Sequence, residues 1–356
     1  MSRNEFIEMA EKQVVIPLIT DLVLHEHKDV SSVLSDGRAL GRVIEEAARR
    51  FQSPLAIPRM DLTIEKEAVL DALGAGGAEN AGYRLSKPLS SDEINEIAET
   101  IAAKPSVKMK ATCDALSCIA AKPDLKPSGM CIGPFSLITR LLADPITPVF
   151  LYGMGVSKNE DPSVGIMQDC LELATAVVDC YCRMQIDAGA RAMFVCEPAA
   201  NTVYCSPQQV TEAEGVFDNL VLEPNLRLKA LFGTYKTDMI FHDCGELNDT
   251  MLAKIARLHP VMLSLGSSRV LWDDARIVPG DVVLYGNLPS KHFYDDTVVS
   301  EAQVDRLCRE LVQNMKQIRH PFILGTECDV LFVPEYRTTI SGKIDRMKKI
   351  ADELRK

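Results

Sequence analysis

Short apolar segments alternate with longer helical patterns along most of this chain. The apolar segments that indicate strands cover residues 55–60, 128–132, 192–196, 237–241, 261–265, 281–285 and 321–326. Helical patterns cover about residues 30–52, 91–103, 110–122, 163–188, 208–219, 247–258, 269–276 and 300–318. Strand and helix units of this length form parallel sheets, because each helix crosses from one strand to the next. The alternation therefore predicts an α/β fold with a parallel sheet.

An eighth strand would close this sheet into a (β/α)8 TIM-type barrel, whereas seven strands would leave an open, doubly wound sheet. We expect the eighth strand in residues 14–24 or near 147–152, which are both apolar. No Gly-x-Gly-x-x-Gly motif follows the first strand, which disfavours the dinucleotide-binding form of the open sheet. The glycine-rich stretch at 73–83 lacks a following Lys-Ser or Lys-Thr, so we interpret it as a surface loop. The barrel is the favoured fold.

The length of 356 residues fits one such barrel domain. We expect residues 1–54 to form an N-terminal helical extension that packs on or caps the barrel, with a helix at 2–13. Residues 55–356 would then form the barrel itself.

Charge and cysteine content exclude several partners and compartments. The net charge of −11 would repel nucleic acid and anionic membrane surfaces. No apolar stretch approaches the roughly 20 residues that are needed to span a bilayer. The acidic, amphipathic N-terminus differs from a secretory signal, and the 11 cysteines are then better explained as reduced thiols than as disulfides. We therefore expect a cytoplasmic protein that binds neither nucleic acid nor membrane.

The stretch Phe241-His242-Asp243-Cys244-Gly245 places an imidazole and a thiol two residues apart, directly after a predicted strand. A second thiol, Cys328, follows the last predicted strand. One His and two Cys at two strand ends would make a three-ligand zinc site with an open fourth position, which is the arrangement of catalytic zinc. Composition alone predicts only about 0.2 His-x-Cys pairs in such a chain. The alternative is a buried histidine bonded to the backbone, beside two thiols that act as small hydrophobic groups.

The remaining histidine pair and most other cysteines carry weaker signals. His25 and His27 flank a glutamate among charged residues, and we interpret them as solvated surface. The other cysteines lack a matching histidine, and we interpret them as packing residues: Cys113, Cys118, Cys170, Cys180, Cys182, Cys196, Cys205 and Cys308.

Residues at the other predicted strand ends are further candidates, because barrel enzymes place their chemistry at the C-terminal ends of the strands. These candidates are Asp61, Gly133, Glu197, Ser264 to Ser267, Asn287 and Glu327.

Several of these segments occur together in a recognisable order. They are Asp61-Leu62-Thr63-Ile64-Glu65, Ile132-Gly133-Pro134-Phe135-Ser136, Asp187-Ala188-Gly189-Ala190, Glu197-Pro198, His242-Asp243-Cys244-Gly245, Gly286-Asn287-Leu288 and Cys328-Asp329-Val330. From about residue 55 to the C-terminus, the chain resembles the uroporphyrinogen decarboxylase superfamily. Its His-x-Cys…Cys pattern is similar to that of the zinc-dependent corrinoid methyltransferases within this superfamily. This pattern is the most specific part of the resemblance, because the decarboxylases proper lack this zinc site.

The resemblance implies a (β/α)8 barrel that transfers a methyl group to or from the cobalt of a cobalamin. The cobalamin would arrive on a separate corrinoid protein, which docks at the mouth of the barrel. By position, His242, Cys244 and Cys328 match the zinc ligands. Glu327 is a candidate for a fourth zinc ligand or a proton donor, although relatives often have a small residue there. Glu197 stands where relatives often have Asp.

The other candidates are assigned more loosely. Asp61 is a further catalytic candidate, and we expect Asn287 and Gly133 to contribute to cofactor binding. Bound zinc could lower the pKa of a substrate thiol or polarise the oxygen of a methyl ether, so the site fits both directions of transfer.

The small-molecule substrate depends on the residues around the barrel mouth. The first 55 residues and the loops at 198–210 and 331–336 would shape its pocket, and five aromatic residues would line it or serve as ordinary packing: Tyr204, Phe293, Tyr294, Phe332 and Tyr336. No group of Arg or Lys at the strand ends indicates a sulfonate site. We therefore favour O-demethylation of a methoxylated aromatic compound over methylation of a thiol such as coenzyme M. Metal-free porphyrinogen decarboxylation and a non-enzymatic zinc-storing or scaffold role are the alternatives.

Overall fold

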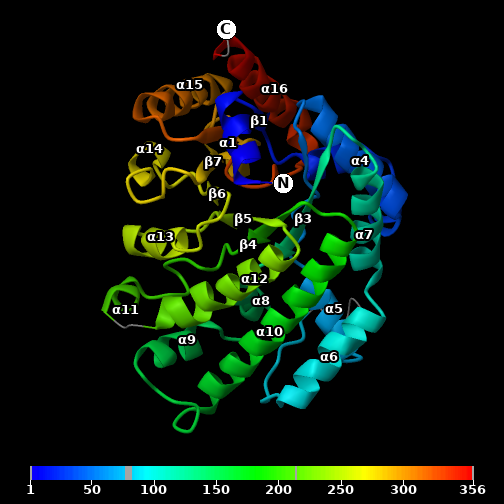
Figure 1. Ribbon diagram of the computed structural model, residues 1–356, viewed down its shortest axis with the longest axis vertical. Coiled ribbons are helices and arrows are strands. Elements are labelled where there is room, and N and C mark those ends of the chain that lie inside the picture. Colours follow the sequence, from blue (N-terminus) through cyan, green and yellow to red (C-terminus); the bar gives the residue numbers. More distant parts are fainter. Residues whose placement is uncertain (1, 77–81, 213–214, 355–356) are drawn as a thin grey trace.

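Eight parallel strands form one sheet in the computed structural model, which describes residues 2–76, 82–212 and 215–354. The order of the strands is β1-β8-β7-β6-β5-β4-β3-β2. Their bounds are β1 Val15–Ile16, β2 Leu55–Ala56, β3 Lys126–Ile132, β4 Ala192–Cys196, β5 Asp238–Asp243, β6 Met262–Leu265, β7 Val283–Leu288 and β8 Phe322–Thr326. The Thr20 hydroxyl donates to the Ile57 carbonyl at 2.6 Å and thereby joins the segments that follow β1 and β2. The predicted (β/α)8 barrel is confirmed (Figure 1).

The eighth strand is β1, where Val15 pairs with Leu324 of β8. It lies within 14–24, in the part of the chain that we assigned to the N-terminal extension. The other candidate, near 147–152, is wrong, because these residues belong to helix α9 (Ile146–Gly153). The Asp144 carboxylate accepts hydrogen bonds from the amides of Ile146 and Thr147 and so starts a helix there.

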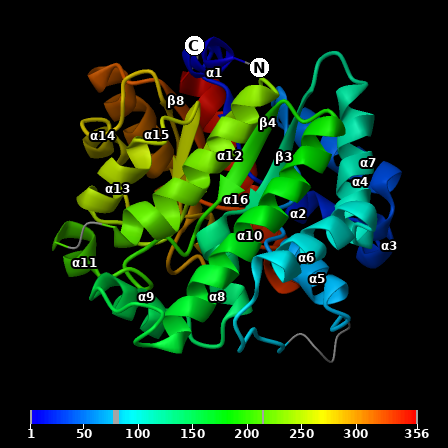
Figure 2. The ribbon, with the colours of Figure 1, turned by 60° about the horizontal axis from the view of Figure 1, so that its bottom comes forward.

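Helices surround the strands on all sides of the barrel (Figures 1 and 2). Those that match the predicted patterns are α1 Arg3–Glu11, α6 Ser91–Ala103, α7 Val107–Ala120, α10 Pro162–Asp187, α13 Asp249–Ala256, α14 Leu271–Asp274 and α15 Glu301–Ile318. The pattern at 30–52 forms two helices, α3 Val30–Ser35 and α4 Gly37–Arg50, because the Asp36 carboxylate accepts from the Ala39 amide and caps a new helix.

Some helices were not expected from the sequence. The pattern at 208–219 is matched in part by α11 Pro207–Glu212, residues 213–214 lie outside the described residues, and a π-helical turn at Asp218–Leu222 leads into α12. The additional helices are α2 Thr20–Leu24, α8 Pro134–Leu141, α9, α12 Glu223–Thr234 and α16 Arg337–Leu354, with short 3-10 turns at Ser290–His292 and Pro334–Tyr336. Helix α5 Ile64–Ala72, in contrast, begins where Glu65, Glu67 and Ala68 indicate a helical turn. The glycine-rich stretch at 73–83 falls partly outside the described residues.

Each strand alternates between two apolar cores. On β4, Phe194 and Cys196 face the core inside the barrel, whereas Met193 and Val195 face the core under the helices. Helix α1 closes the N-terminal end of the barrel, because its Phe6 packs into the inner core. The C-terminal ends of the strands are thereby left as the end where polar groups can gather.

Close packing fixes strand β8 inside the barrel. A Cβ on Gly325 would lie 2.3 Å from the ring of Tyr285, so only glycine leaves room for that ring. The Tyr285 hydroxyl in turn donates to the carbonyl of Ile16 at 2.6 Å. This contact locks β7, β8 and β1 together just below the residues that follow β8.

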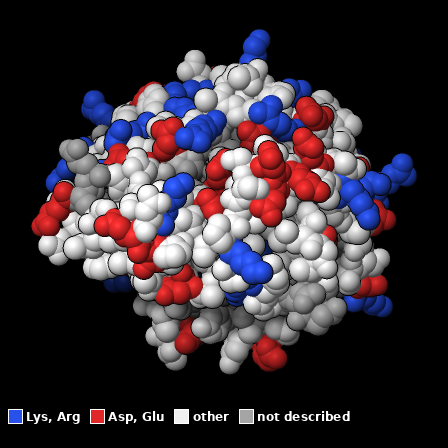
Figure 3. Space-filling model, turned by 90° about the horizontal axis from the view of Figure 1, so that it is seen from below, with Lys and Arg blue, Asp and Glu red and all other residues white. Residues whose placement is uncertain are grey.

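The outer surface is mixed in charge. On the face in Figure 3, acidic side chains gather above the middle and basic side chains are scattered around them. Among the helices of the described residues, none is both long enough and apolar enough to cross a membrane.

Candidate metal centre

His242 reaches the mouth of the barrel because of the two-residue period of strand β5. Ile240 faces the inner core, so His242 points to the same side one step closer to the strand end. Its side chain is fully buried, and its ring lies 5.9 Å from the ring of Phe194 on the neighbouring strand. The imidazole therefore packs against the inner core of the barrel through Phe194.

The two ring nitrogens of His242 differ in their surroundings. Nδ1 lies 2.8 Å from the hydroxyl of Ser264 on β6, whereas the buried Nε2 has no hydrogen-bond partner among the described residues. A buried polar atom without a partner costs about 1–3 kcal/mol, so such atoms are rare unless they serve a purpose. A metal bound at Nε2 would use this nitrogen, and the proton on Nδ1 would then donate to Ser264.

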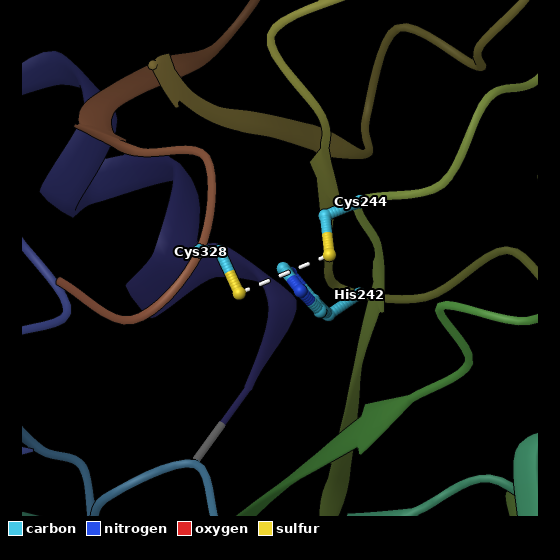
Figure 4. A group of neighbouring side chains, drawn as sticks. All are labelled: His242, Cys244 and Cys328. Atoms are coloured by element: carbon cyan, nitrogen blue, oxygen red, sulfur yellow. Dashed lines mark hydrogen bonds between the residues drawn. The ribbon is translucent and has the colours of Figure 1, made fainter. Parts of the chain in front are cut away.

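Two thiols complete the group that Figure 4 shows. The sulfurs of Cys244, which follows β5, and Cys328, which follows β8, lie 3.8 Å apart. Two thiolates at about 2.3 Å from one tetrahedral zinc are separated by about 3.8 Å, so this spacing suits a shared ion. Within the described part of the chain, the three ligand atoms of His242, Cys244 and Cys328 lie within 4.8 Å of one another. The group that the sequence predicted is therefore assembled, and we call His242, Cys244 and Cys328 the metal group.

The two thiols are not equivalent. The close contact between the two sulfurs, with His242 and Lys291 nearby, holds the pKa of Cys244 well below its usual range. The same contact and burial raise the pKa of Cys328. Cys244 is thus ready to bind a cation as a thiolate, since the thiolate is the form that binds metals.

Ser264 offers a direct test of the histidine geometry. Replacing Ser264 with alanine removes the partner of Nδ1, and we expect zinc affinity to fall by about 10-fold to 100-fold, as is usual when the partner of a metal-bound histidine is lost. Competition with a chromophoric zinc chelator measures this change. Ser128→Ala is the control, because Ser128 is also fully buried in a strand but lies outside the metal group. Equal affinities of the two variants would contradict a role for Ser264.

Glu327 lies beside the metal group, but its carboxylate turns to other partners. It accepts hydrogen bonds from the amides of Ser267 at 3.0 Å and Lys291 at 3.4 Å. The Lys291 ammonium lies 3.9 Å from the same carboxylate and donates to the Cys244 carbonyl at 3.1 Å. These contacts favour a pairing with Lys291 over zinc binding, and the role of Glu327 as a fourth ligand or proton donor stays a prediction.

Lys291 was not anticipated from the sequence. Burial opposes its charge, yet the sulfurs of Cys244 and Cys328 and the Glu327 carboxylate raise its pKa. It therefore places a fixed positive charge next to the metal group. A lysine four residues after Asn287 was the only signal, and lysines in loops are too common to stand out.

Glu197 and Gly133 form a structural contact. The buried Glu197 carboxylate accepts from the amides of Phe135 at 3.1 Å and Ser136 at 2.7 Å in the first turn of α8, and from the Asn225 side chain at 2.9 Å. A Cβ on Gly133 would lie 2.0 Å from this carboxyl group. The contacts favour capping of α8, while the catalytic role of Glu197 and the cofactor-binding role of Gly133 stay predictions.

A glutamine at position 197 separates the two roles. Glu197→Gln places an amide N–H among three N–H donors, and we expect it to lower the free energy of unfolding by about 1–3 kcal/mol without loss of zinc. Urea unfolding and zinc content measure both effects, with Glu223→Gln on the exposed start of α12 as control. A variant that is fully stable but inactive would instead support the catalytic role.

Asp61 and Asn287 hold loops at the barrel mouth. The Asp61 carboxylate accepts from the Thr63 amide and hydroxyl and from Arg59 at 3.1 Å. The Asn287 side chain donates to the carbonyls of Gly266 at 2.7 Å and Arg269 at 2.9 Å, and so ties β7 to the loop after β6. Their proposed catalytic and cofactor-binding roles stay predictions.

The aromatic candidates are spread over the mouth and the core. His25 stacks on Phe332 with ring centroids 4.4 Å apart, so it is half-buried rather than solvated, while His27 is exposed. Tyr294 and Tyr336 lie 6.2 Å apart. Phe293, in contrast, is fully buried and belongs to the core. Tyr336, in the loop at 331–336, is the exposed member of the five candidates, and Tyr204, Tyr294 and Phe332 are half-buried.

Comparison with known proteins identifies the family. The uroporphyrinogen decarboxylase family matches residues 24–336 of the chain, so the chain belongs to this family. Among solved structures, it is similar to a methyltransferase from Methanosarcina mazei, with 14% sequence identity and a TM-score of 0.64 over 99% of both chains. This similarity confirms the barrel fold. No curated protein matches the sequence.

Proposed function

We propose that this protein is a zinc-dependent methyltransferase that moves a methyl group between a small-molecule heteroatom and the cobalt of a cobalamin carried by a separate corrinoid protein. The observation that carries the proposal is the buried Nε2 of His242, which has no hydrogen-bond partner among the described residues and lies beside two thiols spaced for one tetrahedral ion. Membership of the decarboxylase family supports the barrel, and the metal group distinguishes this chain from a decarboxylase that needs no metal.

Each residue of the site would have a separate role. His242, Cys244 and Cys328 would hold the zinc, and Ser264 would orient the imidazole. When bound, zinc supplies one exchangeable position that polarises a thiol or ether oxygen, and cobalamin supplies the methyl-accepting or methyl-donating cobalt. The Lys291 ammonium, held at the Cys244 carbonyl, would stabilise the negative charge on the heteroatom, which develops as an ether loses its methyl group and is already present on a bound thiolate.

The direction that we favour is O-demethylation of a methoxylated aromatic compound. The stacked His25 and Phe332 and the pair of Tyr294 and Tyr336 give the region around the mouth flat apolar surfaces on which an aromatic ring could pack. Transfer to a thiol such as coenzyme M is the second direction. Lys291 beside the metal group can neutralise the anionic oxygen of a demethylated phenol or the sulfur of a bound thiolate, so its position fits both directions. A direct experiment distinguishes them.

That experiment mixes zinc-loaded protein with a Co(I) corrinoid and a panel of methyl donors. We expect the Co(I) absorption to change to that of methyl-Co(III) with at least one methoxylated aromatic donor. The reverse reaction tests demethylation of methylcobalamin by simple thiols. If no ether donor methylates Co(I) and no thiol demethylates methylcobalamin, the proposed activity is wrong. Decarboxylation of a porphyrinogen by metal-free protein would then support the family's other chemistry.

A further inference from the structure

A third sulfur lies beside the metal group. The Sδ of Met60, in the segment after β2, is 3.7 Å from the Sγ of Cys328. Met60 is half-buried and packs against the inner core of the barrel, so its side chain points inward rather than into solvent. Methionine thioethers bind soft and borderline metals weakly.

The spacing of this sulfur fits a coordination site. Cys328 lies 3.8 Å from Cys244 on one side and 3.7 Å from Met60 on the other. Both values match the edge of about 3.8 Å that joins two sulfurs around a tetrahedral zinc. The imidazole and three sulfurs would thus supply four ligand atoms, whereas the Glu327 carboxylate is held by Ser267 and Lys291.

The backbone holds Met60 in this place. Its amide donates to the carboxylate of Asp329 at 2.9 Å, and Asp329 directly follows Cys328 in the chain. On the other side, the Arg59 guanidinium lies 3.1 Å from the carboxylate of Asp61. The loop with the thioether and the loop with the thiol are therefore tied to each other, so that the two sulfurs keep their spacing.

We propose that the Met60 thioether is the fourth protein ligand of the metal when no substrate is bound, and that substrate displaces it. The inference rests on the metal site of the proposed function. A thioether is neutral, so zinc with two thiolates, one imidazole and Met60 carries no net charge. An incoming thiol would bind as its thiolate, release one proton to solvent and free the thioether; an ether oxygen would exchange without a proton change.

X-ray absorption at the zinc edge tests this arrangement on protein in which methionine is replaced by selenomethionine. Only a methionine bound directly to zinc gives a zinc–selenium signal at bonding distance, although the chain has 14 methionines. We expect this signal in zinc-loaded, substrate-free protein. It should vanish in Met60→Leu and persist in Met130→Leu, because Met130 lies in the inner core outside the metal group. Addition of 2-mercaptoethanol should replace zinc–selenium by zinc–sulfur scattering.

The outcomes separate the inference from the proposed function. Stoichiometric zinc with no zinc–selenium signal, or a signal that persists in Met60→Leu, overturns the role of Met60 and leaves the metal site standing. Failure to bind zinc at all overturns both. Zinc content should stay near one per chain in Met60→Leu, since three ligands remain, and a thermal unfolding curve like that of Met130→Leu shows that the fold is intact.

Discussion

Replacing Cys328 with alanine is expected to empty the metal site and abolish methyl transfer. The change removes one of three predicted ligands, and we expect zinc affinity to fall by more than the roughly 100-fold that loss of a supporting partner can cost. It also removes the sulfur that lies against Cys244 and lowers its pKa, so the pKa of Cys244 should rise and a second ligand should be protonated more often. Elemental analysis after gel filtration measures the zinc content per chain.

Cys118→Ala provides the matched control for this variant. Cys118 is also a half-buried free thiol, but it lies on α7 and outside the metal group. We expect it to keep one zinc per chain and its full rate in the Co(I) assay. Zinc retained at wild-type affinity in Cys328→Ala would refute the ligand assignment, and zinc lost from both variants would indicate general unfolding.

The metal group could be predicted from the sequence because its signal is local. His242 and Cys244 are two residues apart at the end of one strand, and Cys328 lies two residues after the end of another strand. In a parallel barrel, all such ends meet at one mouth. Periodicity and spacing therefore suffice to bring the three side chains together without knowledge of any other contact.

Roles that depend on contacts between distant residues could not be predicted in the same way. Glu197 and Gly133 both follow strands, as catalytic residues do, yet the carboxylate of one accepts from the helix that follows the other. Met60 was passed over because a thioether after a strand resembles any core residue. Strand β1 has only two residues, too few to show a period, so its place could be narrowed only to two apolar segments.

The Glu197 cap of α8 and the metal group also differ in the hydrogen bonds that their side chains need. The cap needs a carboxylate with every oxygen engaged, whereas the metal group needs an imidazole nitrogen with no protein partner. Among the described residues, His242 has such a nitrogen and Glu197 accepts from three donors. The unsatisfied nitrogen marks the site because it lies beside two thiols spaced for one ion, since Ser128 and Glu65 also have unsatisfied buried atoms.

A second unsatisfied group predicts a strong dependence of stability on pH. Glu65 on α5 is buried, with one oxygen accepting from the Ile132 amide at 2.9 Å and the other without a partner among the described residues. Burial raises the pKa of Glu65 to about 8, with a smaller contribution from the charge of Asp61. The folded protein therefore holds this acid in its neutral form at neutral pH.

The sign of the effect follows from the two pKa values. Because the folded pKa lies above the unfolded value of 4.5, unfolding releases a proton between about pH 4.5 and 8. The stabilisation from the neutral acid is complete below this window and is lost as the pH rises through it. The slope is about 1.4 kcal/mol for each pH unit, which gives a total of roughly 5 kcal/mol.

Glu65→Gln should abolish this loss, because glutamine can still accept from the Ile132 amide but does not ionise. We expect the variant to gain stability over wild type steadily from about pH 4.5 to 8, with no further gain above that window. Urea unfolding of metal-free protein measures the difference without competition between protons and zinc. Glu99→Gln on the exposed face of α6 should run parallel to wild type. A Glu65→Gln curve that also runs parallel to wild type would mean that Glu65 ionises at the same pH in the folded and unfolded chains.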